Sequence, residues 1–135
     1  MTSNRAAAEA VYDHFRNPGG GHSAIVAVLD DDVVYEAPYY AEFEPKVGKA
    51  ELVAMFDRVE SGGDAFFTEQ TFPTHSLLAT DDPEVFLIEV TGDHGIRSTG
   101  KRYRNHYLHL LQIREGKVVR WREFSNPNVF GEATT

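Results

Sequence analysis

The sequence predicts an α+β fold in which three N-terminal helices pack on a strongly curved, mainly antiparallel sheet. Apolar residues recur mostly with helical spacing in the first sixty positions, whereas runs of β-forming residues separated by turn residues follow Phe66. The pair Glu115-Gly116 between two such runs is typical of a two-residue hairpin loop. With 135 residues and 41% apolar content, the chain fits a single domain over residues 1–135.

Two helices are expected before the first strand. Ser3 or Asn4 can cap the first helix, which runs to about Arg16 and is ended by Asn17-Pro18-Gly19. A second, short helix is predicted from about Ser23 to Leu29, where the apolar residues form one stripe.

A strand and a third helix are expected next. Asp30-Asp31-Asp32 is predicted to break the second helix as a solvated turn, and Val33 to Ala37 is predicted to be a strand. The third helix is expected from Lys49 to about Ser61, with Phe56 on its buried side and residues 61–64 ending it.

The second half of the chain is predicted to be β-structure. Strands are expected over residues 68–79, 84–93, 103–114 and 117–125, broken at 80–83, 92–100 and 115–116. His75 then lies on a strand with no face assigned, and His94 lies in a loop, either as a polar turn residue or at a pocket mouth. The last ten residues are expected to end in a polar tail.

The hairpin around Glu115-Gly116 predicts which residues share a face. If Arg114 faces Lys117, side-chain alternation puts the following pairs on one face of the sheet: Trp121 with Leu110, Glu123 with Leu108, and Ser125 with His106. The opposite face is then predicted to hold Tyr107, His109, Leu111, Arg120, Arg122 and Phe124.

Glu123 is the first candidate for chemistry. Apolar neighbours remove solvation from a carboxylate and raise its pKa, as a general acid or base near neutral pH requires. His106 is predicted to share a proton with Glu123, and Tyr12 to hydrogen-bond a developing oxyanion. The alternative is a structural pair in which His106 or an arginine satisfies a buried carboxylate.

The remaining predicted site residues would line a pocket for a small hydrophobic or aromatic ligand. They are Trp121, Leu108, Leu110, Ser125, Tyr35, Tyr39, Phe56 and Arg104. Arg104, with Arg102, is a candidate to clamp a ligand carboxylate, and the alternative is a solvated charge at the rim.

Composition argues against several classes of function. A net charge of −8 and a pI near 5.1 disfavour nucleic acid and anionic membrane surfaces as partners. The chain has no cysteine, and the His106-x-x-His109 pair faces opposite ways on a strand, so no metal site is expected. Without a signal-like or membrane-spanning apolar run, a cytoplasmic protein is expected.

Several stretches resemble the phenazine-biosynthesis A/B family of the SnoaL-like branch of the nuclear transport factor 2-like superfamily. They are Asn105-His106-Tyr107-Leu108-His109, Glu115-Gly116-Lys117 and Arg122-Glu123-Phe124-Ser125-Asn126-Pro127. The resemblance implies a cystatin-like cone enclosing a hydrophobic pocket, no cofactor, and a homodimer formed through the convex sheet face. It also implies that Glu123 is the counterpart of the family's acid/base glutamate, and that carboxylated compounds are among the ligands of the pocket.

Ketosteroid isomerases of the same superfamily are a weaker comparison. Ala37 stands where they have an aspartate base, Leu108 or Leu110 replaces their protonated acid, and Tyr12 alone resembles their helix tyrosine. The resulting hypothesis is a cofactor-independent acid/base enzyme that cyclises, condenses, isomerises or dehydrates a small cyclic or polyketide-like carbonyl compound. The alternative is a non-catalytic binding or dimerising module of the same fold.

Overall fold

The computed structural model describes residues 2–60 and 65–135. The helices are α1 (Asn4–Arg16), η1 (Pro18–Gly20, a 3-10 turn), α2 (Ser23–Val28), α3 (Lys49–Glu60) and α4 (Pro127–Thr134). The strands are β1 (Leu29–Glu36), β2 (Lys46–Val47), β3 (Phe67–Ala79), β4 (Val85–Ile96), β5 (Arg102–Arg114) and β6 (Lys117–Phe124). They form one sheet in the order β2-β1-β6-β5-β4-β3, antiparallel except where β1 and β6 run parallel. The predicted α+β class is confirmed.

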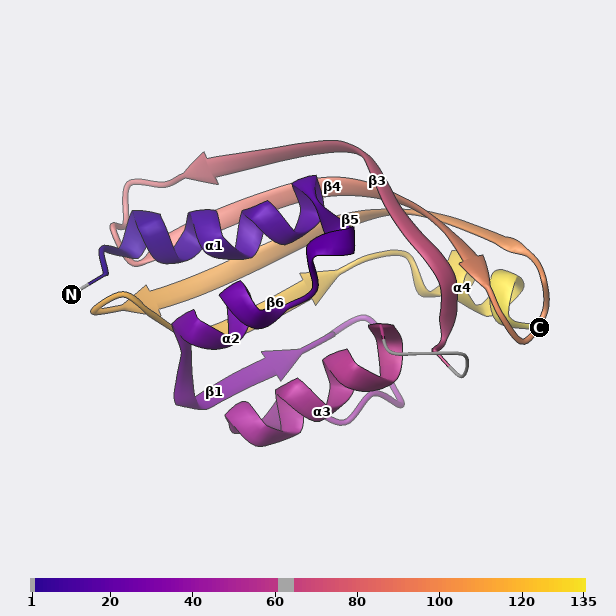
Figure 1. The fold of residues 1–135 in the computed structure, drawn as a ribbon, viewed down its shortest axis with the longest axis horizontal. Coiled ribbons are helices and arrows are strands. Elements are labelled where there is room, and N and C mark those ends of the chain that lie inside the picture. Colours follow the sequence, from indigo (N-terminus) through magenta and orange to yellow (C-terminus); the bar gives the residue numbers. More distant parts are fainter. Residues whose placement is uncertain (1, 61–64) are drawn as a thin grey trace.

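Helices cover one face of the sheet, which we call the inner face. Figure 1 shows α1 and α2 in front of the strands, α3 beside β1, and the long strands β3, β4 and β5 curving toward α4. α1 begins as predicted, because the Ser3 side chain caps it by accepting a hydrogen bond from the backbone N–H of Ala6 over 3.0 Å. α1 and α2 precede β1, and α3 follows β2.

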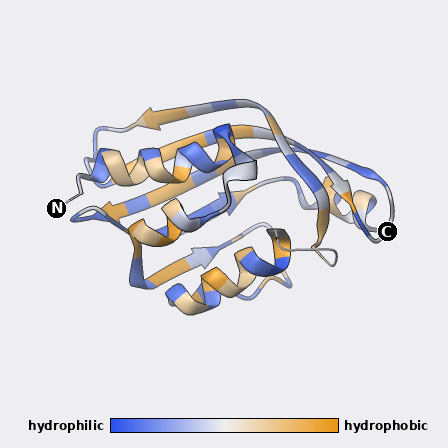
Figure 2. Ribbon diagram, in the orientation of Figure 1, coloured by the Kyte–Doolittle hydropathy of each residue, from blue (hydrophilic) through white to orange (hydrophobic). Residues whose placement is uncertain are grey.

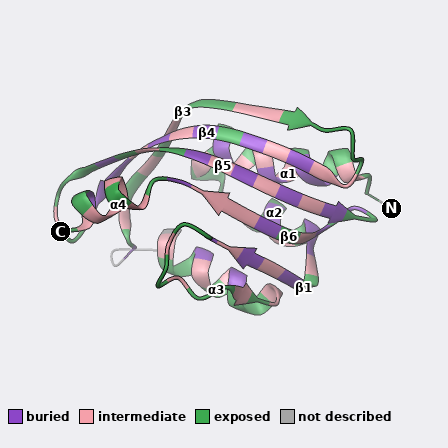
Figure 3. Ribbon diagram, turned by 180° about the vertical axis from the view of Figure 1, so that it is seen from behind, coloured by how far each residue is buried: buried purple, intermediate pink, exposed green. Residues whose placement is uncertain are grey.

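The core lies between these helices and the inner face. Ala7, Val11 and Phe15 of α1 are buried there, and apolar residues alternate along the strands that they cover (Figure 2). Along β4, Phe86, Ile88 and Val90 are buried while the residues between them are not. Figure 3 shows the opposite, outer face, with exposed and partly exposed residues between the buried ones.

The first strand begins earlier than predicted. Asp30-Asp31-Asp32 belongs to β1, so the predicted turn at these residues is wrong. β1 pairs with β6 at Leu29 and again from Val34, and the irregularity between these pairs leaves Asp31 and Asp32 exposed. Three aspartates therefore fit in a strand because their side chains stay in water.

The predicted loop at residues 92–100 is wrong at its start. β4 continues to Ile96, and Gly92 pairs with Asn105 of β5, so His94 is a strand residue. A Cβ atom on Gly92 would lie 2.7 Å from both His94 Nε2 and the Tyr107 ring, so this position needs glycine for close packing rather than for a turn.

The chain end is also helical rather than a polar tail. α4 is capped by Asn126, whose side chain accepts from the backbone N–H of Asn128, and Pro127 occupies its first turn. Ala133 of α4 is buried. The predicted end of the third helix at residues 61–64 lies outside the described residues.

The hairpin of β5 and β6 contains a bulge that changes the predicted register. Arg114 faces Lys117 as predicted, around a turn in which Glu115 (φ 50°) and Gly116 (φ 76°) both have positive φ. Ile113 faces Val118, but the next pair is Gln112 with Arg120, which leaves Val119 as an extra residue on β6. The predicted register is therefore wrong by one residue beyond Val118.

Candidate active site

The bulge places Glu123 on the inner face with a set of aromatic side chains. Beyond it, Trp121 lies opposite Leu111 and Glu123 lies opposite His109 of β5. On the other side of β6, Tyr35 of β1 pairs with Trp121. Because directly paired residues point to the same face, three neighbouring strands carry these side chains toward one region.

His109 is held by Trp121. The indole Nε1–H of Trp121 donates to Nδ1 of His109 over 2.9 Å, and each residue is 3% exposed. Burial, with a smaller contribution from the nearby His14, lowers the pKa of His109 to about 3. Since Nδ1 accepts this bond, the neutral imidazole carries its proton on Nε2.

Glu123 has the properties of an acid/base group. Its side chain keeps part of its solvent-accessible surface, yet desolvation raises its pKa to about 7. A hydrogen bond with Tyr35 opposes this rise by stabilising the carboxylate. Burial, followed by the charge and the hydrogen bond of Glu123, raises the pKa of Tyr35 well above its ordinary value, so Tyr35 is the donor.

More tyrosine hydroxyls surround this carboxyl group. The Tyr40 hydroxyl lies 2.7 Å from Oγ of Ser125, and both Tyr40 and Tyr107 hydrogen-bond with Tyr103. Burial is the main cause that raises the pKa of Tyr40 and of Tyr107, and the charge of Glu123 adds to both. The hydroxyls thus stay protonated and available as donors near Glu123.

His94 is a second buried, neutral histidine. Its Nδ1 accepts from the backbone N–H of Thr71 over 3.2 Å, and burial lowers its pKa to about 4. Its ring packs against Phe67, Phe72 and Tyr103, with centroids 4.8 Å, 5.1 Å and 6.0 Å away. These contacts hold His94 in the packed interior, so the loop position that was predicted for it is wrong.

The structure places four of the predicted lining residues on the same side as Glu123. Trp121, Tyr35 and Ser125 are buried, and Phe56 of α3 packs against Trp121 with ring centroids 5.9 Å apart. Their common placement follows from the parallel pairing of β1 with β6 and from α3 lying over β1.

Other predicted residues lie on the outer face, because the register shift reverses the faces of β5 relative to β6. His106 is exposed and pairs with Glu89 over 3.2 Å, so it does not share a proton with Glu123. Leu108 and Leu110 alternate with the buried Tyr107, His109 and Leu111 and are partly exposed.

The remaining predicted residues also lie away from Glu123. Arg104 is exposed and bound to Asp93 over 3.3 Å, so the predicted carboxylate clamp is wrong. Tyr39 is 61% exposed. Tyr12 hydrogen-bonds with Nδ1 of His75 over 2.8 Å and contacts no part of Glu123, which removes its predicted oxyanion role.

Three residues of this cluster were not predicted from the sequence to belong to the site: His109, Tyr103 and Tyr107. A regular hairpin would put the apolar residues Val118 and Trp121 on opposite faces, since they are three positions apart. Both are buried only because Val119 is an extra residue between them. This spacing was the available signal for the bulge.

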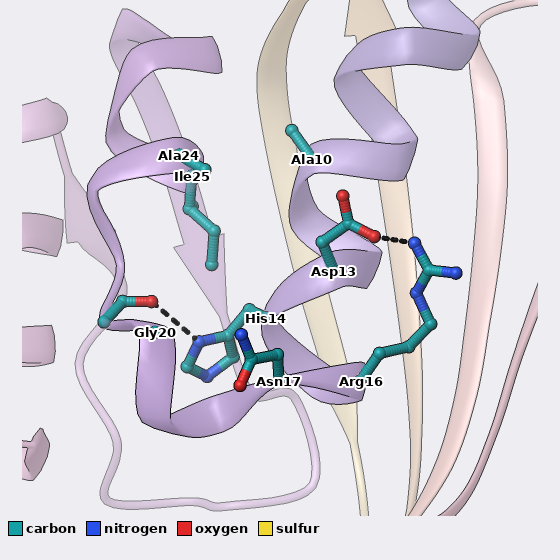
Figure 4. Close-up of a pocket in the computed structure, with 9 residues that line it drawn as sticks. Ala10, Asp13, His14, Arg16, Asn17, Gly20, Ala24 and Ile25 are labelled. Atoms are coloured by element: carbon teal, nitrogen blue, oxygen red, sulfur yellow. Dashed lines mark hydrogen bonds and ion pairs between the residues drawn. The ribbon is translucent and has the colours of Figure 1, made fainter.

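Two cavities open in the described part of the chain. One of about 460 Å³ opens between α1, η1 and α2, and Figure 4 shows Asp13 in it, bound to Arg16, beside His14. Another, of about 400 Å³, is an open groove at the end of β6, and it is lined by the predicted site residues Tyr39, His106, Leu108 and Ser125 together with Tyr107, Phe124, Asn126 and Pro127.

The described residues, 2–60 and 65–135, lack two kinds of feature. These residues contain no group of three or more His, Asp or Glu side chains placed to hold a metal ion. None of the helices among them is long and apolar enough to span a membrane.

Comparison with known proteins places the chain in a family. Residues 5–121 match the model of the SnoaL-like domain. YesE, an uncharacterized Bacillus subtilis protein, is 30% identical over 106 residues, which cover 77% of this chain and 69% of YesE. PhzB1, a phenazine biosynthesis protein of Pseudomonas aeruginosa, is 39% identical over 54 residues, or 38% of this chain and only 33% of PhzB1.

Solved structures show the same fold. A protein described as a putative polyketide cyclase from Pseudomonas putida superposes with a TM-score of 0.80 at 20% identity, covering 100% of this chain and 99% of that one. A phenazine biosynthesis-related protein from Pseudomonas aeruginosa superposes with a TM-score of 0.77 at 22% identity, covering 97% and 82%. With its nuclear transport factor 2-like architecture and its matched residues, the chain belongs to the SnoaL-like domain family.

Proposed function

We propose that the chain is a cofactor-independent enzyme in which Glu123 moves a proton on a small cyclic or polyketide-like carbonyl compound. The observation that carries the proposal is the placement of Glu123, a desolvated carboxyl group with a pKa of about 7 that is surrounded by neutral hydrogen-bond donors. The names of relatives that refer to polyketide cyclisation and phenazine biosynthesis support the same class of chemistry.

The arrangement suits proton abstraction next to a carbonyl group. A carboxylate with a pKa near the working pH removes the proton from carbon, and the electron pair moves onto the carbonyl oxygen. Neutral hydroxyl and imidazole donors stabilise the resulting enolate oxygen. Returning the proton to another atom gives isomerisation, and attack of the enolate carbon on a second carbonyl gives ring closure.

Convergence of polar groups favours an enzyme over a simple binding module. A purely structural glutamate would be satisfied by one partner, whereas Tyr35 hydrogen-bonds Glu123, and the charge of Glu123 also acts on Tyr40 and Tyr107. His109 is directly opposite on β5. Because perturbed carboxyl groups with several polar neighbours are enriched at active sites, this cluster supports catalysis.

Hydrogen–deuterium exchange at the α-carbons of 2-tetralone tests the proposal without knowledge of the natural substrate. When 2-tetralone is incubated in D₂O with the wild-type protein, its exchange should be faster than in buffer alone. Proton NMR measures this rate. Glu123→Gln should lower the protein-dependent rate about 100-fold or more, the range expected for loss of a general base. His106→Gln, on the outer face, is the matched control and should exchange like the wild type.

The outcomes separate the two classes of function. Equal protein-dependent exchange by wild type and Glu123→Gln would reject Glu123 as the base. Binding of 2-tetralone without exchange above the buffer rate would favour the binding module. A melting temperature of Glu123→Gln at or above that of the wild type would show that a rate difference does not arise from unfolding.

A further inference from the structure

We propose that the site formed by Glu123 and His109 on the inner face takes an uncharged ligand that presents a carbonyl oxygen to the Nε2–H of His109, and that Trp121 is the positioning residue for this donor. The inference rests on the proposed function, since it names the substrate class of the same site. It replaces the expectation, implied by the family resemblance, that carboxylated compounds are among the ligands.

The first observation is the fixed polarity of His109. The Trp121 indole, which is a donor only, occupies Nδ1 over 2.9 Å, so the ring must carry its proton on Nε2. Within residues 2–60 and 65–135, no group accepts a hydrogen bond from this Nε2 atom. His109 therefore offers one uncharged N–H donor, and a carbonyl oxygen is the matching acceptor.

The second observation is the position of every cation. All thirteen lysine and arginine residues belong to the described part of the chain, and none of them is buried. On the hairpin that carries His109 and Glu123, the basic residues are exposed or on the outer face: Arg102, Arg104, Arg114, Lys117, Arg120 and Arg122. Arg122, the least exposed of them, stacks on Phe124 of the outer face.

Lys46 is the cation that comes nearest to an exception. It pairs with Tyr35 and so shares its face, but its ammonium group lies over the Phe43 ring, 5.5 Å from the centroid, on the edge strand β2. The pKa of Glu123 is shifted by desolvation and by Tyr35, and Lys46 is not among the causes. The Lys46 ammonium group is thus held on Phe43 at the edge of the sheet.

A ligand carboxylate would be poorly accommodated in these surroundings. Burying an anion without a cation or several charge-assisted hydrogen bonds is costly, and ionised Glu123 would add like-charge repulsion. The surrounding rings instead suit an uncharged ring system, because Phe15 and Tyr107 lie against His109 with centroids 4.8 Å and 6.0 Å away. Charge and shape thus select for an uncharged carbonyl compound.

A pair of probes tests this selectivity directly. Trp121 is the only tryptophan in the chain, so its indole N–H gives a single, self-assigned signal in a ¹⁵N-labelled sample. Methyl 2-naphthoate and 2-naphthoate share a ring system but differ in charge at pH 8. Titration should shift the indole signal with a dissociation constant at least tenfold lower for the ester. Equal binding, or tighter binding of the carboxylate, would overturn the proposal.

Variants and a tautomer measurement assign the cause. Glu123→Gln should narrow the preference for the ester, because it removes the like-charge repulsion between Glu123 and 2-naphthoate. Calorimetry should show that Trp121→Phe and His109→Gln each weaken ester binding about tenfold. His109→Ala should bind the ester more weakly than His109→Gln does, because glutamine retains an N–H donor. Long-range ¹⁵N NMR of the wild type should show the Nε2–H tautomer at His109, and the Nδ1–H tautomer would reject the proposal even if the variants do not fold.

Failure of this proposal and failure of the proposed function give different results. Preference for the ester without 2-tetralone exchange would keep the substrate class and reject proton transfer. Exchange that depends on Glu123, combined with preference for 2-naphthoate, would keep proton transfer and reject the substrate class.

Discussion

His109 on β5 lies directly opposite Glu123 on β6, on the face that the helices cover. Directly paired residues have Cβ atoms roughly 5 Å apart, so a neutral ring donor and a desolvated carboxyl group flank the same small volume. The extra residue Val119 creates this relationship. Without it, the register would shift by one residue and Glu123 would no longer lie opposite His109.

Removing the hydroxyl of Tyr35 should raise the pKa of Glu123 further. The hydrogen bond from Tyr35 stabilises the carboxylate and lowers the pKa of Glu123, whereas desolvation raises it. Tyr35→Phe should therefore move the acidic limb of the pH–rate profile for 2-tetralone exchange to higher pH. An acidic limb that is unchanged or moves to lower pH would show that this hydrogen bond is absent in solution.

Glu123 should leave a measurable trace in the pH dependence of stability. Its pKa of about 7 in the folded chain exceeds the ordinary value of 4.5, so the folded state binds more protons between these values. The free energy of unfolding that Glu123 contributes is fully present below pH 4.5 and is lost as the pH rises through 7. Glu123→Gln should gain stability relative to wild type across this window, by up to about 3 kcal/mol.

Urea unfolding of both proteins at several pH values between 4 and 8 measures this difference. The comparison of the two proteins cancels the contributions of the other titrating groups. A difference that is constant from pH 4.5 to 7.5 would contradict the burial of the Glu123 carboxyl group.

The two buried histidines should stay neutral well below the ordinary pKa of histidine. Burial lowers the pKa of His109 to about 3 and of His94 to about 4. Their stability contributions are present above pH 6.5 and are lost as the pH falls through these values. In an NMR titration, the ring signals of both should remain those of neutral imidazole at pH 5, with His109→Gln providing an assignment. A midpoint near 6.5 for either would show that its ring is solvated.

Much of the fold follows from sequence periodicity and turn chemistry. The Ser3 cap, the helices α1, α2 and α3, and the Glu115-Gly116 hairpin were predictable because they depend on neighbouring residues. Continuation of β4 through Gly92 was not, since only contacts with His94 and Tyr107 show why that position requires a glycine. A glycine within a strand and a glycine in a loop have the same local sequence signal.

The candidate site was predictable only in part, for a specific physical reason. Glu123 was identified from its apolar neighbours and from the family resemblance, and its raised pKa agrees with that argument. Its predicted partner His106 was wrong because a bulge of one residue exchanges every neighbour across the hairpin. The same bulge explains why His109 belongs to the candidate site and why His106 does not.

Association of two chains through the outer face, which the family resemblance implies, stays a prediction. Leu78 is 47% exposed there and pairs with Leu87, which pairs in turn with Leu110, so three neighbouring strands present one apolar patch. Light scattering coupled to size exclusion should give a dimer for the wild type and a monomer for Leu110→Glu. A monomeric wild type, or a dimer that survives Leu110→Glu with an unchanged dissociation constant, would contradict pairing through this patch.

The ionisation of Glu123 tests the central claim most directly. A ¹³C NMR titration of its side-chain carboxyl carbon, assigned by the loss of the signal in Glu123→Gln, gives the pKa of this one group. The inward placement opposite His109 predicts a midpoint of about 7. A midpoint near the ordinary 4.5 would mean that the carboxyl group is solvated, and would contradict the proposed chemistry.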